Sequence, residues 1–346
     1  MYRETYEGDD DMKKGFLLLT LIAMLAVALV GCGSKGEEDV VADLTTKLEN
    51  VKSYKMNANL VLQTGQEAQE YEVEVSHQKP QFYRIALKNK ARDITQIILR
   101  NEEGVFVLTP HLNKSFRFQS GWPENHGQVY LYESLIKDIL ADDNRVFSTE
   151  GDQYVFETAA NYQNKTLVSQ KIFLDKDLKP TKVDVMDADM KVIVGVEFSN
   201  VEFDASFEKD YFDMKRNMQQ ATLESITTMK EESEKQQGSF GVYHPTYTPE
   251  NVKQVEVKEV QQDGHPVVVL RYEGDYNYNI VQERPRAKMV TMTSGKPVDL
   301  GFTVGVMTER SLLWTYDGVD FKLTGDGLPE AEMVNIAQSV VGQSSK

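Results

Sequence analysis

Cys32 is the only cysteine in this chain of 346 residues, and no other single feature constrains the fold as strongly. It follows an apolar run from Phe16 to Val30, which is preceded by Lys13 and Lys14. One thiol forms no internal disulfide, so the part of the chain beyond Cys32 depends on its own hydrophobic core. The run of 15 residues is shorter than the roughly 20 that a helix needs to cross a bilayer.

Basic residues, a short apolar run and small residues before a cleavage site are typical of a secretory signal peptide. In Leu29-Val30-Gly31-Cys32 a cysteine stands at the cleavage site, and the segment resembles the lipobox of bacterial lipoproteins. That resemblance implies transfer of a lipid to the Cys32 thiol, with palmitate as a label for the acyl chains. It also implies a lipid-anchored protein on the extracytoplasmic face of the cell membrane. The alternative is a transmembrane anchor with an incidental cysteine.

The first eleven residues are acidic where a signal peptide should be basic. Five acidic residues lie between Tyr2 and Asp11, against the single basic residue Arg3. This favours Met12 as the natural start, with residues 1–11 as translated leader. We therefore interpret 1–31 as leader and signal peptide, and 32–39 as a lipidated tether.

The net charge of the chain is −16, and residues 1–31 hold three basic and five acidic residues, which leaves −14 beyond them. Binding nucleic acid needs clustered Lys and Arg, so this acidity argues against a nucleic-acid partner. It also argues against electrostatic docking on anionic lipid, which needs a polybasic stretch. Attachment to the membrane is therefore assigned to the acyl chains at Cys32.

Alternation with a period of two begins at Tyr54 and predicts a half-buried strand. Its apolar side, with Tyr54, Met56, Leu60 and Leu62, is the candidate lining of an apolar cavity. Further strand patterns lie at 71–75, 83–87, 96–100, 105–109, 115–118, 145–148, 153–157, 169–174, 181–187 and 191–203. Apolar residues at helical spacing predict helices over 40–51 and 127–140. The fold class is therefore α+β and mostly antiparallel, with a bent sheet covered by helices over residues 40–215.

A charged run without apolar residues, 230–239, is the predicted domain boundary, and a helix over 212–229 leads into it. Residues 216–239 are thus a helix and linker. A smaller α+β domain follows at 240–346, in which Asp263-Gly264 predicts a hairpin turn. Pro329 opens its last helix at the first helical position.

The sequence shows no catalytic machinery. The histidines lack metal-ligand spacing and are expected to be strand or loop residues: His77, His111, His126, His244 and His265. No phosphate-binding loop, nucleotide-binding glycine motif or nucleophile elbow is present. Trp122 lies in a loop and is a candidate pocket rim; the alternative is a loop packed onto the sheet. No cofactor and no metal site is predicted.

Several segments resemble known families. The strands Ile172–Val183 and Val196–Phe203, with Asp210-Tyr211-Phe212, are similar to the LolA-like lipoprotein superfamily, and the whole layout to the sporulation or germination lipoproteins of spore-forming Firmicutes. Leu313–Gly318 and Ile336–Ser339 resemble a small domain of extracytoplasmic Firmicute regulators. The resemblance implies an incomplete barrel whose cavity accepts acyl chains in carriers. A soluble carrier transports its cargo away from the membrane. A protein tethered at Cys32 cannot do so, and in this it departs from the carriers.

Three hypotheses follow. The first is a membrane-anchored, sporulation-associated lipoprotein that binds a lipid or a protein partner without catalysis. The second is a regulator that senses an envelope signal and contacts an anti-sigma-like membrane protein. The third, an envelope hydrolase, has no catalytic constellation to support it.

Overall fold

The computed structural model describes residues 35–63, 68–91, 94–112, 114–118, 122, 128–162, 166–219, 241–284, 291–292, 295–300, 303–316 and 318–342. The lipobox Leu29–Cys32, His126 and the boundary at 230–239 lie outside these residues. The predicted fold class, α+β with mostly antiparallel strands, is confirmed by two large sheets with few helices.

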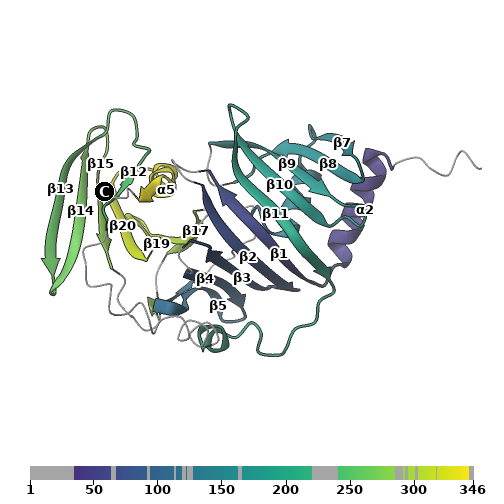
Figure 1. Ribbon diagram of the computed structural model, residues 1–346, viewed down its shortest axis with the longest axis horizontal. Coiled ribbons are helices and arrows are strands. Elements are labelled where there is room, and N and C mark those ends of the chain that lie inside the picture. The colour runs from purple at the N-terminus through teal and green to yellow at the C-terminus, as the bar shows by residue number, and fades with distance from the viewer. Residues whose placement is uncertain are drawn as a thin grey trace, which may run out of the picture. The chain divides into compact units, whose positions relative to one another are not determined.

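The larger sheet has twelve strands in the order β16-β6-β5-β4-β3-β2-β1-β11-β10-β9-β8-β7 (Figure 1). Its strands are β1 (Ser53–Leu62), β2 (Gln69–Gln78), β3 (Phe82–Asn89), β4 (Ile94–Asn101), β5 (Gly104–Thr109), β6 (Lys114–Phe118), β7 (Val146–Glu150), β8 (Gln153–Ala159), β9 (Leu167–Leu174), β10 (Pro180–Asp187), β11 (Val192–Phe203) and β16 (Thr291–Met292). Neighbours are antiparallel except β16 and β6. In the described part of the chain no pairing joins β16 to β7, so the sheet is open.

The chain reaches this order by running outwards to one edge and then inwards from the other. It meanders from β1 to β6, crosses over through helix α3 (Tyr132–Ala141), and returns from β7 to β11. The last strand pairs with the first, with Tyr54 opposite Phe203. Strand β1 therefore lies in the middle of the sheet, between β2 and β11.

Two turns in the returning half use the same aspartate chemistry. Asp175 Oδ1 accepts the backbone N–H groups of Asp177 and Lys179, both at 2.9 Å. Asp187 Oδ1 accepts those of Asp189 and Lys191, both at 3.0 Å. Aspartate favours such turns, because its side chain accepts backbone N–H groups a few residues further along the chain.

The helices are α2 (Glu37–Asn50), α3, α5 (Glu330–Gln338) and a 3-10 turn, η1 (Pro110–Leu112). In the second half of α2, the Lys47 ammonium lies 4.3 Å from the centre of the Phe203 ring. The predicted helix 127–140 begins later, at Tyr132, because residues 129–130 form a turn. Of the predicted helix 212–229, residues 214–219 are helical and the rest lies outside the described residues.

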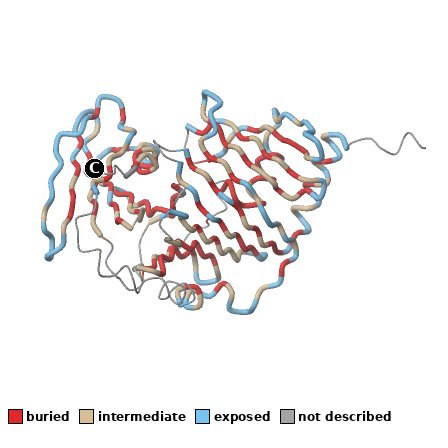
Figure 2. Tube along the Cα trace, in the orientation of Figure 1, coloured by how far each residue is buried: buried red, intermediate tan, exposed pale blue. Residues whose placement is uncertain are grey.

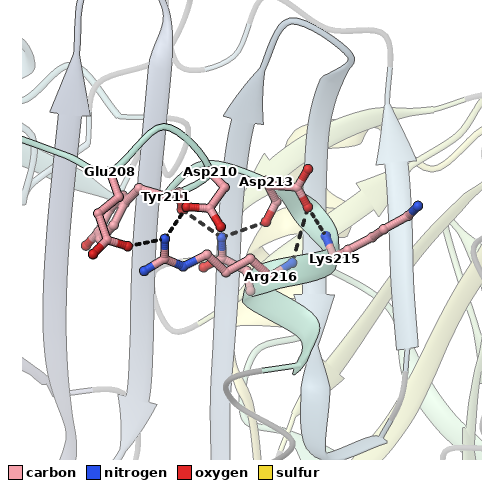
Figure 3. Close-up of polar contacts among 7 residues, drawn as sticks. Glu208, Asp210, Tyr211, Asp213, Lys215 and Arg216 are labelled. Atoms are coloured by element: carbon pink, nitrogen blue, oxygen red, sulfur yellow. Dashed lines mark hydrogen bonds and ion pairs between the residues drawn. The ribbon is translucent and has the colours of Figure 1, made fainter.

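The segment 204–219 packs on one face of β4 and β5. Its Phe212 joins a buried cluster with Ile97, Leu99, Phe106 and Leu108. Figure 3 shows how the segment is held: the Arg216 guanidinium pairs with Glu208 and Asp210. Asp213 Oδ1 accepts the backbone N–H groups of Lys215 and Arg216 at 2.7 and 3.2 Å, which caps the start of the helix.

The second sheet has seven strands in the order β13-β14-β15-β20-β19-β18-β17. They are β13 (Lys253–Gln262), β14 (His265–Glu273), β15 (Asn277–Glu283), β17 (Lys296–Asp299), β18 (Val304–Met307), β19 (Ser311–Tyr316) and β20 (Val319–Asp326). A separate pair joins β12 (Tyr243–Pro245) to β21 (Val340–Gly342). Gln262 lies opposite His265, and Asp263 and Gly264 have φ of 53° and 78°, which confirms the predicted two-residue hairpin turn.

Strand β16 lies in this part of the chain but pairs with β6 of the larger sheet. The expected position of Pro329 is wrong by one residue. Pro329 is the residue before the first helical position of α5 and has extended backbone angles. Proline lacks an N–H group, so both positions suit it.

Polar contacts link the two sheets. Lys114 of β6 is 9% exposed, and its ammonium lies 2.6 and 2.7 Å from the two carboxylate oxygens of Asp320 in β20. Gln96 Oε1 of β4 accepts hydrogen bonds from Thr303 Oγ1 at 2.8 Å and from Val304 N at 3.0 Å.

Candidate functional site

The candidate site begins with one face of β1, which we call the inner face. Alternation along the strand places Tyr54, Met56, Ala58, Leu60 and Leu62 on it, and all five are at most 6% exposed. The four residues predicted to line an apolar cavity thus share one side of the sheet and are all buried. Tyr54 lies beside Tyr132 of α3, with ring centres 6.1 Å apart.

A buried carboxylate joins α3 to this face. Glu133, in the first turn of α3, accepts a 2.5 Å hydrogen bond from the Tyr54 hydroxyl at Oε2. Its Oε1 lies 3.0 Å from Nε2 of His77 in β2. Nδ1 of His77 donates to the Phe82 carbonyl, also at 3.0 Å. Both ring nitrogens therefore meet oxygen acceptors, a pattern that the doubly protonated ring satisfies.

The surroundings fix the charge of this group. Burial raises the pKa of the Glu133 carboxyl, but hydrogen bonds from His77 and Tyr54 and the His77 charge outweigh it, so the pKa is below its ordinary value. Burial, together with the charge of Glu133, raises the pKa of Tyr54 well above its ordinary value. Glu133 is thus held as a carboxylate, and Tyr54 as its neutral donor.

Aromatic rings enclose the pair. The His77 ring stacks on Tyr83 of β3 at 4.2 Å between ring centres, and Tyr83 meets the edge of Trp122 at 6.3 Å. Trp122, the candidate pocket rim, is 4% exposed, and its carbonyl accepts a 2.7 Å hydrogen bond from Arg100 Nη1. The structure therefore brings Trp122 close to the Tyr54 end of the inner face.

The side chains of His77 and Glu133 are only 2% and 15% exposed. A general acid or base must reach the proton that it transfers, whereas these two groups bond to each other. Their geometry supports a mechanical role: the buried pair ties the start of α3 to β1 and β2. Removing either partner leaves the other charge buried without compensation.

A second polar group lies further along the same helix. Asp138 Oδ2 accepts a 2.8 Å hydrogen bond from Gln170 Nε2 of β9, and the Tyr162 hydroxyl donates to Gln170 Oε1. Burial raises the pKa of the Asp138 carboxyl to about 6, although hydrogen bonds from Gln170 and Asn161 partly lower it. The face of α3 that covers the sheet therefore carries two acidic groups with opposite pKa shifts.

The sequence alone did not predict that His77 and Glu133 are partners. One signal was available, because His77 continues the inward side of β2 after Tyr71, Val73 and Val75. Of the other histidines, His111 lies in η1, and burial lowers its pKa to about 4. His244 and His265 lie in strands.

Within the part of the chain that the structure describes, no group of three or more His, Cys, Asp or Glu could hold a metal ion. In the same residues, no helix has both the length and the apolar character needed to cross a bilayer.

The fold defines an antiparallel α+β protein with a large open sheet, and Glu133 joins helix α3 to its strands β1 and β2. A family model described as sporulation protein YdcC-like matches residues 12–212. The Bacillus subtilis sporulation protein YdcC is 44% identical over 340 residues, which cover 97% of this chain and 99% of the relative. The chain belongs to the YdcC-like family of sporulation proteins.

Solved structures also match. The MucA/MucB complex of Pseudomonas aeruginosa covers 90% of this chain and 100% of the matched chain, at 12% identity and a TM-score of 0.33. A LolA superfamily protein from Nitrosomonas europaea covers 51% of this chain and 98% of its own, at 9% identity and a TM-score of 0.30.

Proposed function

We propose that this member of a sporulation protein family is a membrane-tethered lipoprotein on the extracytoplasmic face, which binds a hydrophobic ligand and carries out no catalysis. Family membership supports the link to sporulation. The segment Leu29-Val30-Gly31-Cys32 supports the tether. The inner face of β1, which is apolar and buried and meets α3 at Tyr54, carries the binding part of the proposal.

The tether is tested at Cys32. A thioether to a diacylglyceryl group needs a sulfur atom, so Cys32→Ser leaves no atom that can form it. Labelled palmitate fed to growing cells should mark the wild-type protein and not the variant. Equal labelling of the two proteins contradicts the tether.

Tyr132 and Glu133 of α3 lie against Tyr54, so a ligand that enters at this end of the inner face must displace the start of α3. The Glu133–His77 contact and the Tyr54 hydrogen bond are what such a movement must break. Apolar pockets bind ligands mainly by burying their surface, which suits the side chains of Met56, Leu60 and Leu62. The ligand class that fits is a lipid or free fatty acid with one or more acyl chains.

Ala58 offers a direct test, because it lies on the inner face between Met56 and Leu60 and is 6% exposed. If the face holds a ligand, Ala58→Phe occupies the ligand's place and abolishes binding of a fluorescent fatty acid. It should also remove any lipid mass that native mass spectrometry detects on the wild-type protein. Ala159→Phe, at an exposed position of β8, is the matched control and should change neither result.

A fully packed core gives the opposite result. The wild-type protein then carries no added mass and binds no fatty acid, which refutes ligand binding at this face. In that case Ala58→Phe overpacks the interior and lowers the free energy of unfolding by about 1–3 kcal/mol.

A further inference from the structure

Strand β13 is a ten-residue edge strand with both of its faces in solvent. All of its residues are exposed except the half-buried Val260, and Figure 2 shows the strand in pale blue along most of its length. Val255 and Val257 are large apolar side chains that are 52% and 48% exposed. Among the described residues, β14 is the one strand that pairs with β13.

An open edge offers a row of backbone N–H and C=O groups to another strand. Natural edge strands are commonly protected by charge, and lysine is used most often. The charges of β13 instead change sign along one face, with Glu256 and Lys258 two residues apart. An edge with charges of both signs repels a like-charged strand less and matches a strand of complementary pattern.

We infer that β13 pairs with β13 of a second copy of this chain, antiparallel and centred on Val257. A two-fold axis perpendicular to the sheet places Val257 opposite Val257 of the second copy. It also places Glu256 opposite Lys258 of the second copy, and Lys258 opposite its Glu256. The pairing forms two opposite-charge contacts and one apolar contact across the axis.

Neighbouring registers lack this match. Residues that lie opposite each other in an antiparallel pair point to the same side of the sheet. The two-fold axis must therefore lie midway between two copies of the same residue, so each possible register is named by its central residue. Centring on Glu256, Lys258 or Glu259 sets two like charges directly against each other, which is unfavourable. Centring on Val260 forms no charge pair for Lys258, which then lies opposite Gln262. The interface is isologous, so it closes as a dimer.

A β-bulge at Gln254–Glu256 interrupts the pairing of β13 with β14 and leaves Val255 without a partner in β14. The bulge limits regular pairing to the part of the strand from Glu256 onwards, which contains the proposed centre.

Charge exchange tests the pairing on the full chain purified in detergent, with molar mass measured by sedimentation. The wild type should form a dimer. Glu256→Lys and Lys258→Glu, each alone, place like charges across the axis and should weaken the dimer about tenfold or more. Mixing the two single variants should give a heterodimer, and the combined Glu256→Lys/Lys258→Glu chain should dimerise again. Lys322→Glu, an exposed reversal in central strand β20, should leave the dimer unchanged.

A single cysteine checks the register. In a Cys32→Ser chain, Val257→Cys places two thiols on residues whose Cα atoms are about 4.5–5.5 Å apart in an antiparallel pair. Disulfides need about 4.4–6.8 Å, so diamide should yield a covalent dimer, whereas Lys322→Cys should not. A monomeric wild type, a dimer that both single reversals leave intact, or a failure of the mixed variants to associate would each overturn the inference.

Discussion

β1 and β13 are strands of ten residues each, and they lie in opposite environments. β1 has a strand on both sides, β2 and β11, and its inner face is at most 6% exposed. β13 has β14 on one side, and its valines at 255 and 257 are about half exposed. The difference shows that strand length and alternation decide little about burial; the number of paired neighbours and the cover of one face decide it.

One neighbour of β1, β2, is the next strand along the chain, but the other comes from far away. Its partner β11 lies more than 130 residues away, and its cover, α3, joins it through Glu133. The partner of β13 is the next strand, reached by a two-residue turn. The first strand is therefore stabilised by the whole larger sheet, whereas the second depends on one local hairpin.

The largest effect on stability is expected from removing the buried carboxylate of Glu133, in the first turn of α3. Glu133→Ala leaves His77 buried without its partner, so the free energy of unfolding should fall by about 3–5 kcal/mol, measured by urea denaturation. Glu256→Ala in β13 removes a carboxylate that is exposed in the single chain, and it should leave the free energy of unfolding of the monomer nearly unchanged. If the Glu133→Leu/His77→Phe chain is as unstable as Glu133→Ala, the loss comes from packing and not from the unpaired charge.

The next largest loss of stability is expected from truncating a buried apolar side chain of β1. Leu60 is 1% exposed, and Leu60→Ala should lower the free energy of unfolding by about 2–5 kcal/mol through lost burial and a residual cavity. Val257→Ala in β13, measured at protein concentrations low enough to keep the chain monomeric, should change it by less than about 0.5 kcal/mol. Similar losses at the two positions would show that β13 is buried within the monomer.

The buried carboxyl of Asp138 in α3 should make the stability of the protein depend on pH. The carboxyl of Asp138 has a pKa of about 6 when folded, against 3.8 ordinarily, so the unfolded chain loses this proton first as pH rises. Stability attributable to Asp138 therefore falls between about pH 4 and pH 6, by roughly 3 kcal/mol in total. Asp138→Asn removes this loss, so the variant should gain stability over the wild type across that window and keep the gain above it.

Glu133 acts in the opposite direction at lower pH. Its pKa lies below the ordinary 4.5, so its contribution is fully present above about pH 4.5 and is lost as the pH falls through the folded value. Chemical denaturation at a series of pH values separates the two groups. Parallel pH profiles for the wild type and Asp138→Asn would contradict a buried, uncharged Asp138.

Local patterns in the sequence were sufficient for the strands and turns that depend on neighbouring residues. The segment 191–203 and the turn at Asp263-Gly264 match β11 and the β13–β14 hairpin closely. β18 was missed, because four buried residues in a row show no alternation. The Glu133–His77 contact was missed for a different reason: its partners come from a helix and a strand, and only the tertiary fold brings them together.

The smallest expected effect separates local from global opening. Gly264 has φ of 78°, and a Cβ added there meets nothing within 4 Å, so Gly264→Ala costs only backbone strain, about 1 kcal/mol. Because β13 has one paired neighbour within the chain, the strain should speed hydrogen exchange of β13 amides in the monomer about fivefold and leave β1 amides unchanged. Gly151→Ala, with φ of 58° and equally open space in the β7–β8 turn, is the matched control and should affect β7 alone. If β1 amides exchange faster in the Gly264 variant as well, the hairpin opens together with the larger sheet, and the two strands belong to one cooperative unit.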